Sequence, residues 1–315
     1  MKALVFTAPA TLELLDVGEP EVAAGEVLVH VRAAGICGSE LHGVRQPGFR
    51  KPPLIMGHEF AGLTADGQAV VINPILSCGN CGQCQRGMRH ICAKRRIIGV
   101  HRAGGFAERV AVPGSALRAM PSWLSFQAAA MVEPAANAVH AWNRAGAPAG
   151  ARVAVIGCGA IGLLCMLAAL AGEAGGVDVS DLSPSRVSVG RGLGAAAGDL
   201  SGDYDVVIDA VGTPATRRKS VAHQRPGGVA VWLGLAEEEA GFDANALVRE
   251  EKQVLGSFAY SDEEFTRAMT LLRDTDLAWT ASYPLTAGAE IFTGLMKGGT
   301  HPVKALLHPE EPGGR

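Results

Sequence analysis

The sequence predicts an α/β protein in which a mainly-β domain accompanies a doubly wound parallel sheet, and three observations support this. The chain has 315 residues, more than one hydrophobic core usually serves. Its first 135 residues read as short strands broken by turns, as in residues 26–32, where apolar and polar residues alternate. Beyond Ala135, alanine-rich helical segments alternate with apolar β-type runs, the pattern of a parallel sheet with helices on both faces.

The strands expected in the parallel sheet are short apolar runs separated by helical segments. They lie at residues 153–156, 177–179, 205–208, 229–233 and 254–255. The C-terminal segment has a helix expected from Asp262 and a strand expected at residues 303–307, and it fits neither a further unit of this sheet nor a separate domain. Its return to the first domain therefore stays open.

The charge of the chain excludes two classes of partner. A formal net charge of −3 without a long basic run gives no attraction for nucleic acid or for an anionic membrane surface. Residues 1–9 lack the apolar core and cleavage site of a secretion signal, so we expect a cytoplasmic protein. Residues 153–172 are uncharged and of membrane-spanning length, but glycines interrupt them after a β-type run, which favours a buried strand followed by a buried helix.

Four of the seven cysteines form a closely spaced group. The pattern C-x2-C-x2-C-x7-C, in a segment with several glycines, is made by Cys78, Cys81, Cys84 and Cys92. Four thiolates at this spacing close a tetrahedron around Zn²⁺, and the glycines let the loop turn back on itself. Such a closed site has no position for substrate, so we expect a structural zinc lobe at residues 78–92. Free or redox-paired thiols and an iron–sulfur cluster are the alternatives.

A second group of candidate ligands combines three residue types. Cys37, His58 and Glu59 supply a thiolate, an imidazole and a carboxylate, about twenty residues apart. Three mixed ligands with a free fourth position are typical of catalytic zinc, which favours loss of the proton from a hydroxyl group. Each residue alone is better explained as a small buried side chain, a core histidine or a solvated acid. Their coexistence with the cysteine lobe and a nucleotide fold favours the metal site.

The first strand of the expected parallel sheet leads into a dinucleotide-binding motif. The motif G-x-G-x-x-G precedes an apolar helix and consists of Gly157, Cys158, Gly159, Ala160, Ile161 and Gly162. In this context the glycines let a pyrophosphate approach the helix N-terminus. Nineteen residues after Gly162, Asp181 is placed to bind the adenosine ribose and to repel a 2′-phosphate, which favours NAD over NADP. Arg186 either serves such a phosphate or flanks the adenine.

In this order the motifs resemble those of the zinc-containing medium-chain alcohol dehydrogenases, especially the branch with sorbitol, threonine and galactitol-phosphate dehydrogenases. The resemblance covers nearly the whole chain. It implies a GroES-like catalytic domain of residues 1–136 and 260–315, with a Rossmann NAD-binding domain of residues 137–259 between these segments. It also implies two zinc ions per chain, a small-molecule alcohol or ketone as substrate, and a homodimer or homotetramer.

The resemblance assigns roles around the catalytic metal. Cys37, His58 and Glu59 match the zinc ligands. Glu133 matches a further acidic position that binds or approaches the metal, and glutamate there resembles the polyol branch. Glu40 stands where relatives usually have an aspartate bonded to the zinc-bound histidine, and its longer side chain leaves that contact open.

Further roles concern proton transfer and the cofactor. Ser39 matches the hydroxyl that takes the substrate proton, and His42 matches the histidine that passes this proton to solvent through the nicotinamide ribose. Residues 63–69 form a shorter loop than relatives have, and Gly43 replaces an aromatic residue near the substrate. The later cofactor contacts implied at strand ends are Val211, Leu233, Leu235 and Ser257.

The sequence therefore predicts a zinc-dependent oxidoreductase that transfers a hydride between a secondary alcohol and NAD(H). The resemblance and Glu133 favour a polyol, a cyclitol, an amino-cyclitol or a sugar-derived alcohol as substrate. One alternative is a nucleotide-sensing or scaffold protein on the same fold, against which the intact ligand and relay residues count. The other is a zinc-free quinone or enoyl reductase, which the cysteine lobe and the paired metal ligands disfavour.

Overall fold

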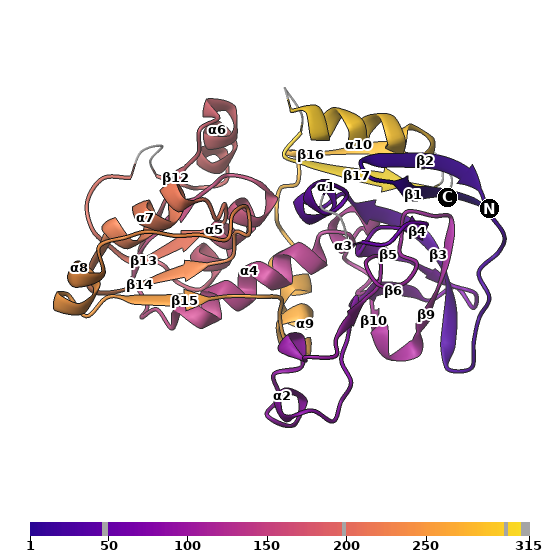
Figure 1. Cartoon of the computed structure of the whole chain (residues 1–315), viewed down its shortest axis with the longest axis horizontal. Coiled ribbons are helices and arrows are strands. Elements are labelled where there is room, and N and C mark those ends of the chain that lie inside the picture. Colours follow the sequence, from indigo (N-terminus) through magenta and orange to yellow (C-terminus); the bar gives the residue numbers. More distant parts are fainter. Residues whose placement is uncertain (46–49, 197–199, 299–301, 310–315) are drawn as a thin grey trace. The chain divides into compact units, whose positions relative to one another are not determined.

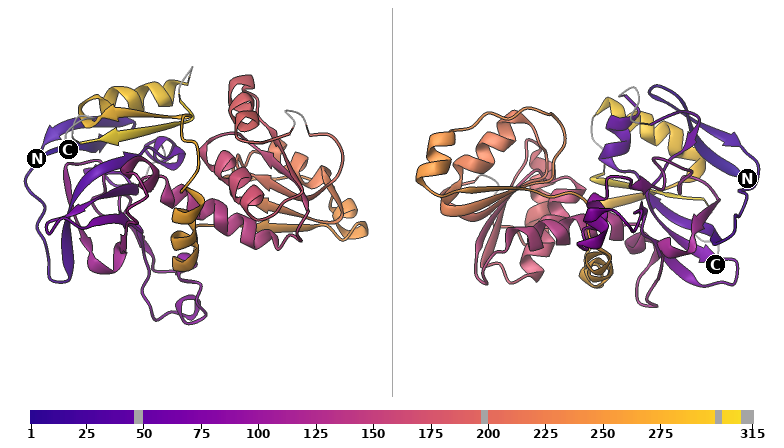
Figure 2. Two further views of the ribbon diagram at one scale, coloured as in Figure 1. Left: turned by 180° about the vertical axis from the view of Figure 1, so that it is seen from behind. Right: turned by 60° about the horizontal axis from the view of Figure 1, so that its bottom comes forward.

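A computed structural model describes residues 1–45, 50–196, 200–298 and 302–309. The chain divides into two units, the first formed by Met1–Glu133 with Leu272–Arg315 and the second by Pro134–Leu271. In Figure 1 and Figure 2 the last strands of the chain (yellow) lie in the same unit as the first ones (indigo). The C-terminal segment thus returns to the first unit.

The first unit is built around a seven-stranded sheet. The strand order is β10-β6-β5-β3-β17-β16, with β9 also paired to β3. β3 pairs antiparallel with β5, which sets Gly35 opposite Glu59, and with β17, which sets Gly35 opposite Leu306. The strands are β3 (Glu26–Gly35), β5 (Glu59–Thr64), β6 (Ala69–Ile72), β9 (Arg109–Pro113), β10 (Leu117–Ala119), β16 (Thr280–Pro284) and β17 (Lys304–His308).

A three-stranded sheet and short helices complete the first unit. The small sheet has the order β2-β1-β4. The core of the first unit contains Phe60, Phe106 and Phe292, each at most 1% exposed. Burying a phenylalanine contributes about 1.5–3 kcal/mol to the stability of the fold. The remaining elements are β1 (Lys2–Ala8), β2 (Thr11–Asp16), β4 (Leu54–Ile55), α1 (Gly38–Gly43), α3 (Phe126–Ala129), α10 (Gly288–Lys297) and the 3-10 turns Gly114–Ala116 and Leu285–Ala287.

The cysteine segment forms a small lobe of this unit. β7 (Ile75–Leu76) and β8 (Arg96–Ile97) pair antiparallel and bring the two ends of the segment together. Between them lie the one-turn helix α2 (Gly82–Gln85) and a 3-10 turn at Arg89–Ile91. Little regular structure holds the lobe, so its shape depends on what its cysteines bind.

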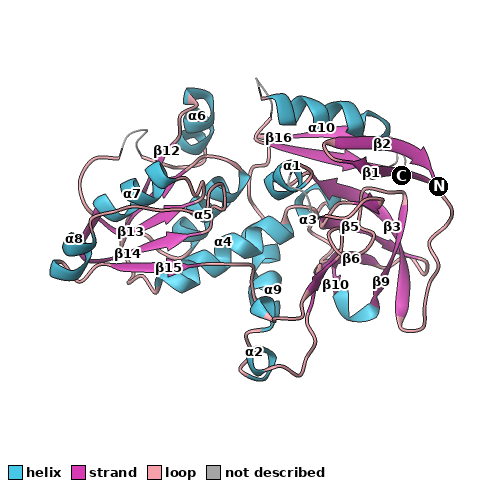
Figure 3. Ribbon diagram, in the orientation of Figure 1, coloured by secondary structure: helices cyan, strands magenta, loops and turns pink. Residues whose placement is uncertain are grey.

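The second unit contains a parallel sheet of five strands in the order β12-β11-β13-β14-β15. These strands cover the five apolar runs expected from the sequence except Leu233, which lies just beyond the end of β14, and this confirms the predicted parallel sheet. They are β11 (Arg152–Ile156), β12 (Gly176–Ser180), β13 (Tyr204–Asp209), β14 (Gln224–Trp232) and β15 (Gln253–Gly256). The helices of this unit, drawn in cyan in Figure 3, are α4 (Val132–Ala145), α5 (Ala160–Ala171), α6 (Pro184–Gly192), α7 (Pro214–Ala222), α8 (Ala244–Arg249) and α9 (Asp262–Leu271).

The uncharged segment at residues 153–172 is a strand followed by a helix, as expected. β11 occupies its start, and α5 begins within the glycine motif, at Ala160. Leu163, Leu164 and Met166 of α5 are fully buried. In the described parts of the chain, no helix has the length and apolar character needed to cross a membrane.

Glu264 connects two helices of the second unit. Its Oε2 atom lies 2.8 Å from Nδ1 of His140 on α4, and its Oε1 atom accepts a 2.8 Å hydrogen bond from Asn143. Glu264 lies on α9, which also packs against α5. Helix α9 therefore belongs to the second unit, although it lies beyond residue 259. Burial raises the pKa of Glu264, but hydrogen bonds from His140, Ser261 and Asn143 lower it overall to about 2.

We expect Glu264→Gln to reduce the acid sensitivity of the fold. The folded-state pKa of Glu264 lies below its ordinary value of 4.5. Its stabilisation is therefore complete above that pH and is lost as the pH falls toward 2, an effect of about 3 kcal/mol. The free energy of urea unfolding, measured from neutral pH to about pH 3, tests this against Glu263→Gln, a change at the exposed neighbour. Equal pH dependence in all three proteins would contradict it.

Candidate catalytic and cofactor sites

Three candidate metal ligands meet at one end of β3. Cys37 follows this strand, while His58 and Glu59 stand at the start of β5, which the antiparallel pairing places alongside. One ligand atom from each residue lies within 4.8 Å of the other two. His58 is 8% exposed and Glu59 is fully buried. The structure thus brings together the three residues that the sequence singled out.

Glu40 holds the histidine of this group from α1. Its buried carboxylate lies 3.0 Å from Nδ1 of His58 and accepts 3.0 Å hydrogen bonds from the backbone N–H groups of Gly57 and Cys37. Burial raises the pKa of Glu40, but the charge and hydrogen bond of His58 outweigh it and lower the pKa overall. Nδ1 of His58 is therefore occupied, which leaves Nε2 for a metal. Glu40 therefore contacts His58, although its side chain is one methylene longer than the aspartate of most relatives.

A buried lysine accompanies Glu59. The Nζ atom of Lys304, on β17, donates to Oε2 of Glu59, and the two side chains are 4% and 1% exposed. Burial lowers the pKa of Lys304, but the charges of Glu59 and Cys37 outweigh it and raise the pKa overall. Gly35 leaves room for this pair, because a Cβ atom there would lie 2.2 Å from Oε2 of Glu59. Within the described residues, Oε1 of Glu59 is buried and has no hydrogen-bond partner, which suits a metal ligand.

The expected relay residues lie on α1. The Ser39 hydroxyl donates to Sγ of Cys37 at 3.3 Å, and the Ser39 carbonyl accepts a 2.9 Å hydrogen bond from buried Arg50. His42 is exposed on the last turn of the same helix. Glu133 lies in the first turn of α4 and is half-buried. The ligand group found among the described residues does not include it.

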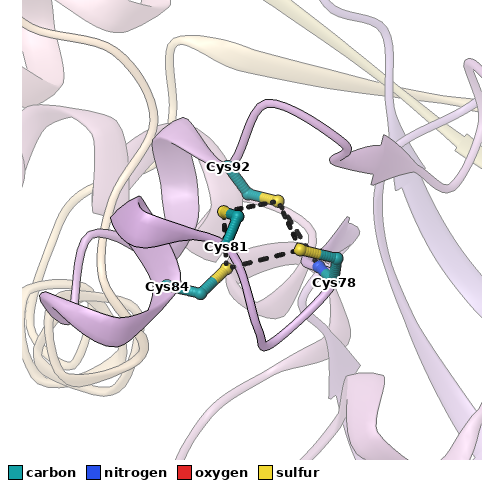
Figure 4. Close-up of side chains that lie close together, drawn as sticks. All are labelled: Cys78, Cys81, Cys84 and Cys92. Atoms are coloured by element: carbon teal, nitrogen blue, oxygen red, sulfur yellow. Dashed lines mark hydrogen bonds between the residues drawn. The ribbon is translucent and has the colours of Figure 1, made fainter.

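The four cysteines of the lobe surround a common point (Figure 4). Four of the distances between their sulfur atoms are 3.4, 3.5, 3.7 and 4.0 Å. Tetrahedral zinc with Zn–S bonds of ordinary length requires sulfur atoms about 3.8 Å apart. Cys84 and Cys92 are buried, whereas Cys78 and Cys81 are half-buried. The group is therefore arranged as a closed four-sulfur site.

We expect Cys84→Ser to remove one zinc ion from the lobe and to leave the other in place. A serine hydroxyl is a poor zinc ligand, and the structural site closes only with four donors. Zinc per chain, measured by elemental analysis after dialysis, should fall from about two to about one. Cys165→Ala, at another buried cysteine on a helix, is the control and should keep both ions. Unchanged zinc in the Cys84 variant would contradict a four-cysteine site.

The glycine motif connects β11 to α5, and two of its glycines have no substitute. Gly157 has a φ of +97°, and a Cβ atom on Gly162 would lie 1.7 Å from the Gly157 carbonyl oxygen. A Cβ atom on Gly159 would meet nothing within 4 Å. A side chain at Gly159 would thus occupy open space at the start of α5, where a pyrophosphate is expected to lie.

Asp181 reaches this motif from the end of β12. Its carboxylate accepts a 2.7 Å hydrogen bond from the backbone N–H of Cys158 and a 2.8 Å bond from that of Ser183. Burial and the charge of Asp181 raise the pKa of the Cys158 thiol, and the charge of Arg186, on α6, acts in the opposite direction. The remaining expected contacts, all just beyond the carboxyl ends of β13, β14 and β15, are Val211, Leu233, Leu235 and Ser257.

Comparison with known proteins identifies the family. Residues 23–122 match the model described as alcohol dehydrogenase GroES-like domain, and residues 160–274 match zinc-binding dehydrogenase. The L-threonine 3-dehydrogenase of Saccharopolyspora erythraea is 31% identical over 93% of this chain and 95% of its own. The chain belongs to the zinc-containing medium-chain alcohol dehydrogenases.

Two further comparisons place it within this family. The L-galactonate-5-dehydrogenase of Escherichia coli K12 is 31% identical over 93% of this chain and 94% of its own. A putative zinc-binding dehydrogenase from Sinorhizobium meliloti, solved bound to NADP, has a TM-score of 0.91 and 29% identity over 98% of this chain and 99% of its own. As a zinc-containing medium-chain alcohol dehydrogenase, the chain is an oxidoreductase that uses zinc and a nicotinamide dinucleotide.

Sequence reasoning missed one residue of the alcohol dehydrogenase site, Lys304. No motif marks this lysine, and it lies 245 residues from Glu59 in the chain. A signal was nevertheless present, because residues 303–307 form an apolar run interrupted by this single charge. A charged residue in a strand expected to be buried requires a partner of opposite charge.

Proposed function

We propose that the protein oxidises a secondary alcohol of a polyol, cyclitol, amino-cyclitol or sugar derivative, with NAD⁺ as hydride acceptor. The same site allows the reverse reaction. The observation that carries this proposal is the convergence of Cys37, His58 and Glu59, with Glu40 bonded to Nδ1 of the histidine. Three different donors facing one point, one of them an unpaired buried oxygen, fit an open catalytic zinc site.

Each residue of the site has a distinct part in this proposal. Cys37, His58 and Glu59 hold the metal, and Ser39 accepts the substrate proton and passes it to exposed His42. When bound, zinc supplies Lewis acidity at the substrate hydroxyl, and the dinucleotide supplies the hydride acceptor. The Ser39 hydroxyl now bonds to Cys37, so it lies beside the metal position that the proposal requires.

The preference for NAD rests on Asp181. Its carboxylate is fixed beside the glycine motif by two backbone hydrogen bonds, where it would bind ribose hydroxyls and repel a 2′-phosphate. Arg186 offers the opposite attraction, and the related enzyme from Sinorhizobium meliloti binds NADP. The position of the Asp181 carboxylate beside the glycine motif favours NAD. Both dinucleotides are included in the test below.

The substrate class and the assembly state follow from the relatives. Enzymes named for threonine and galactonate, both bearing several polar groups, are 31% identical to this chain. We infer a substrate of this polar kind, consistent with Glu133 at the position typical of the polyol branch. A homodimer or homotetramer is proposed from the family resemblance, and β15 stands at the edge of its sheet, where a second copy can add strands.

The test begins with zinc per chain on purified protein and continues with NAD⁺ and NADP⁺ reduction at 340 nm across polyols, cyclitols and sugar acids. About two zinc ions with turnover on one compound would support the whole proposal. Two zinc ions without turnover on any compound would reject the proposed substrate class. One zinc ion or none would reject the mechanism and favour the sensor or zinc-free reductase alternatives.

A further inference from the structure

Arg217 is a buried cation that the proposed chemistry does not use. It lies on α7 and is 7% exposed, whereas its neighbour Arg218 on the same helix is exposed. Its guanidinium carbon lies 5.3 Å from the centre of the Trp232 ring. The indole N–H of Trp232 donates to the Ser220 hydroxyl at 2.9 Å, which in turn donates to the Arg217 carbonyl. The guanidinium thus sits in a defined place at the end of β14.

Among the described residues, the hydrogen-bond partners of this guanidinium belong to one loop. Nη1 of Arg217 donates to the backbone carbonyls of Glu238 and Glu239 at 3.2 and 3.1 Å, and Nη2 approaches that of Gly234 at 3.5 Å. The side chains of Glu238 and Glu239 are exposed. Arg217 therefore binds the backbone of residues 234–239 through several carbonyls at once, which the planar fork of an arginine does better than a lysine.

The loop held in this way carries two of the expected cofactor contacts. Leu233 and Leu235 follow β14, and Leu235 is 78% exposed. On its other side the loop is bonded to the residues after β13, where the N–H of Glu237 donates to the carbonyl of Gly212 at 3.1 Å. Gly212 and Gly234 touch so closely that a Cβ atom on either would lie about 2 Å from the other's backbone. The two loops form one surface at the carboxyl end of the sheet.

We propose that Arg217 is a positioning residue for the dinucleotide, which it serves by fixing residues 234–239 at the carboxyl ends of β13 and β14. Arg217 does not touch the cofactor in this proposal. It keeps Leu233 and Leu235 in the binding conformation, so that binding does not have to order the loop. The inference rests on the proposed function, because it assigns these two leucines to the cofactor.

The test compares Arg217→Met with Arg218→Met, which removes the neighbouring exposed arginine from the same helix. NADH affinity is measured by fluorescence titration. We expect Kd to rise about tenfold in the Arg217 variant, since ordering the loop then opposes binding, and to change less than about twofold in the Arg218 variant. An endoproteinase that cleaves after glutamate reports the loop directly through Glu237, Glu238 and Glu239, and it should cut the Arg217 variant faster.

Two further measurements keep the result decisive. Zinc per chain should stay unchanged, and Arg217→Lys, which keeps the charge but loses the fork, should give an intermediate Kd and carries the test if the methionine variant does not fold. Faster cleavage with unchanged NADH affinity, or weaker affinity with unchanged cleavage, would overturn the inference. Failure of the unaltered protein to bind NADH or NADPH would instead reject the proposed function.

Discussion

Replacing Cys37 with alanine is expected to lower kcat/KM for alcohol oxidation by at least about a thousandfold, because it removes a ligand from the metal on which the reaction depends. His58 and Glu59 alone leave an incomplete site. NADH binding should be nearly unchanged, since the glycine motif and Asp181 belong to the second unit. Initial rates at 340 nm, zinc per chain and NADH titration measure the three quantities.

The cysteine lobe provides the internal control for this variant. Its four sulfur ligands are separate from Cys37, so the variant should retain about one zinc ion per chain. Undiminished turnover would rule out the proposed mechanism. Loss of NADH binding together with activity would show that the substitution had disturbed the fold, and the test would then pass to Cys37→Ser, which conserves side-chain volume.

Lys304→Met is expected to destabilise the first unit by about 3–5 kcal/mol, because it leaves the Glu59 carboxylate buried without its cation. Both side chains are almost completely buried, and the lysine donates directly to the carboxylate. The free energy of unfolding from urea titrations, taken after the catalytic metal has been removed by a chelator, measures this loss. Bound zinc offers Glu59 a second cation, so the loss should be smaller in the zinc-loaded protein.

A double-mutant cycle separates the ion pair from simple packing. Lys304→Met combined with Glu59→Gln removes both charges, so the pair of changes should cost clearly less than the sum of the two single ones. Lys304→Arg, which retains the charge, should lie between the unaltered protein and the methionine variant. Additive effects of the two single changes would show that Lys304 and Glu59 do not interact in solution.

The parts of the site that the sequence predicted are those that depend on neighbouring residues in the chain. The four cysteines lie within one short segment, and the glycine motif joins a strand and a helix that follow each other directly. Their geometry is fixed by local spacing and by the conformations open to glycine. Local spacing alone does not predict the convergence of Cys37 with His58 and Glu59, because this convergence depends on the pairing of β3 with β5.

The contacts that escaped prediction join segments far apart in the chain or use backbone groups. Lys304 meets Glu59 only because β17 returns to β3. The Asp181 carboxylate is bonded to the N–H groups of Cys158 and Ser183, and Arg217 binds carbonyls rather than the nearby acidic side chains. A sequence displays side chains and hides backbone donors and acceptors, so such partners become visible only with the fold.

One carboxylate in the first unit serves two purposes at the same time. Glu40 closes the first turn of α1 through the N–H of Cys37, and it also orients His58 and bonds Gly57. A variant at this position will therefore alter helix formation and ligand geometry together. The phenotype of such a variant will combine effects on catalysis and on folding. In a family member with the shorter aspartate at this position, the backbone at Cys37 must lie closer to the backbone at Gly57 if all three bonds are to form.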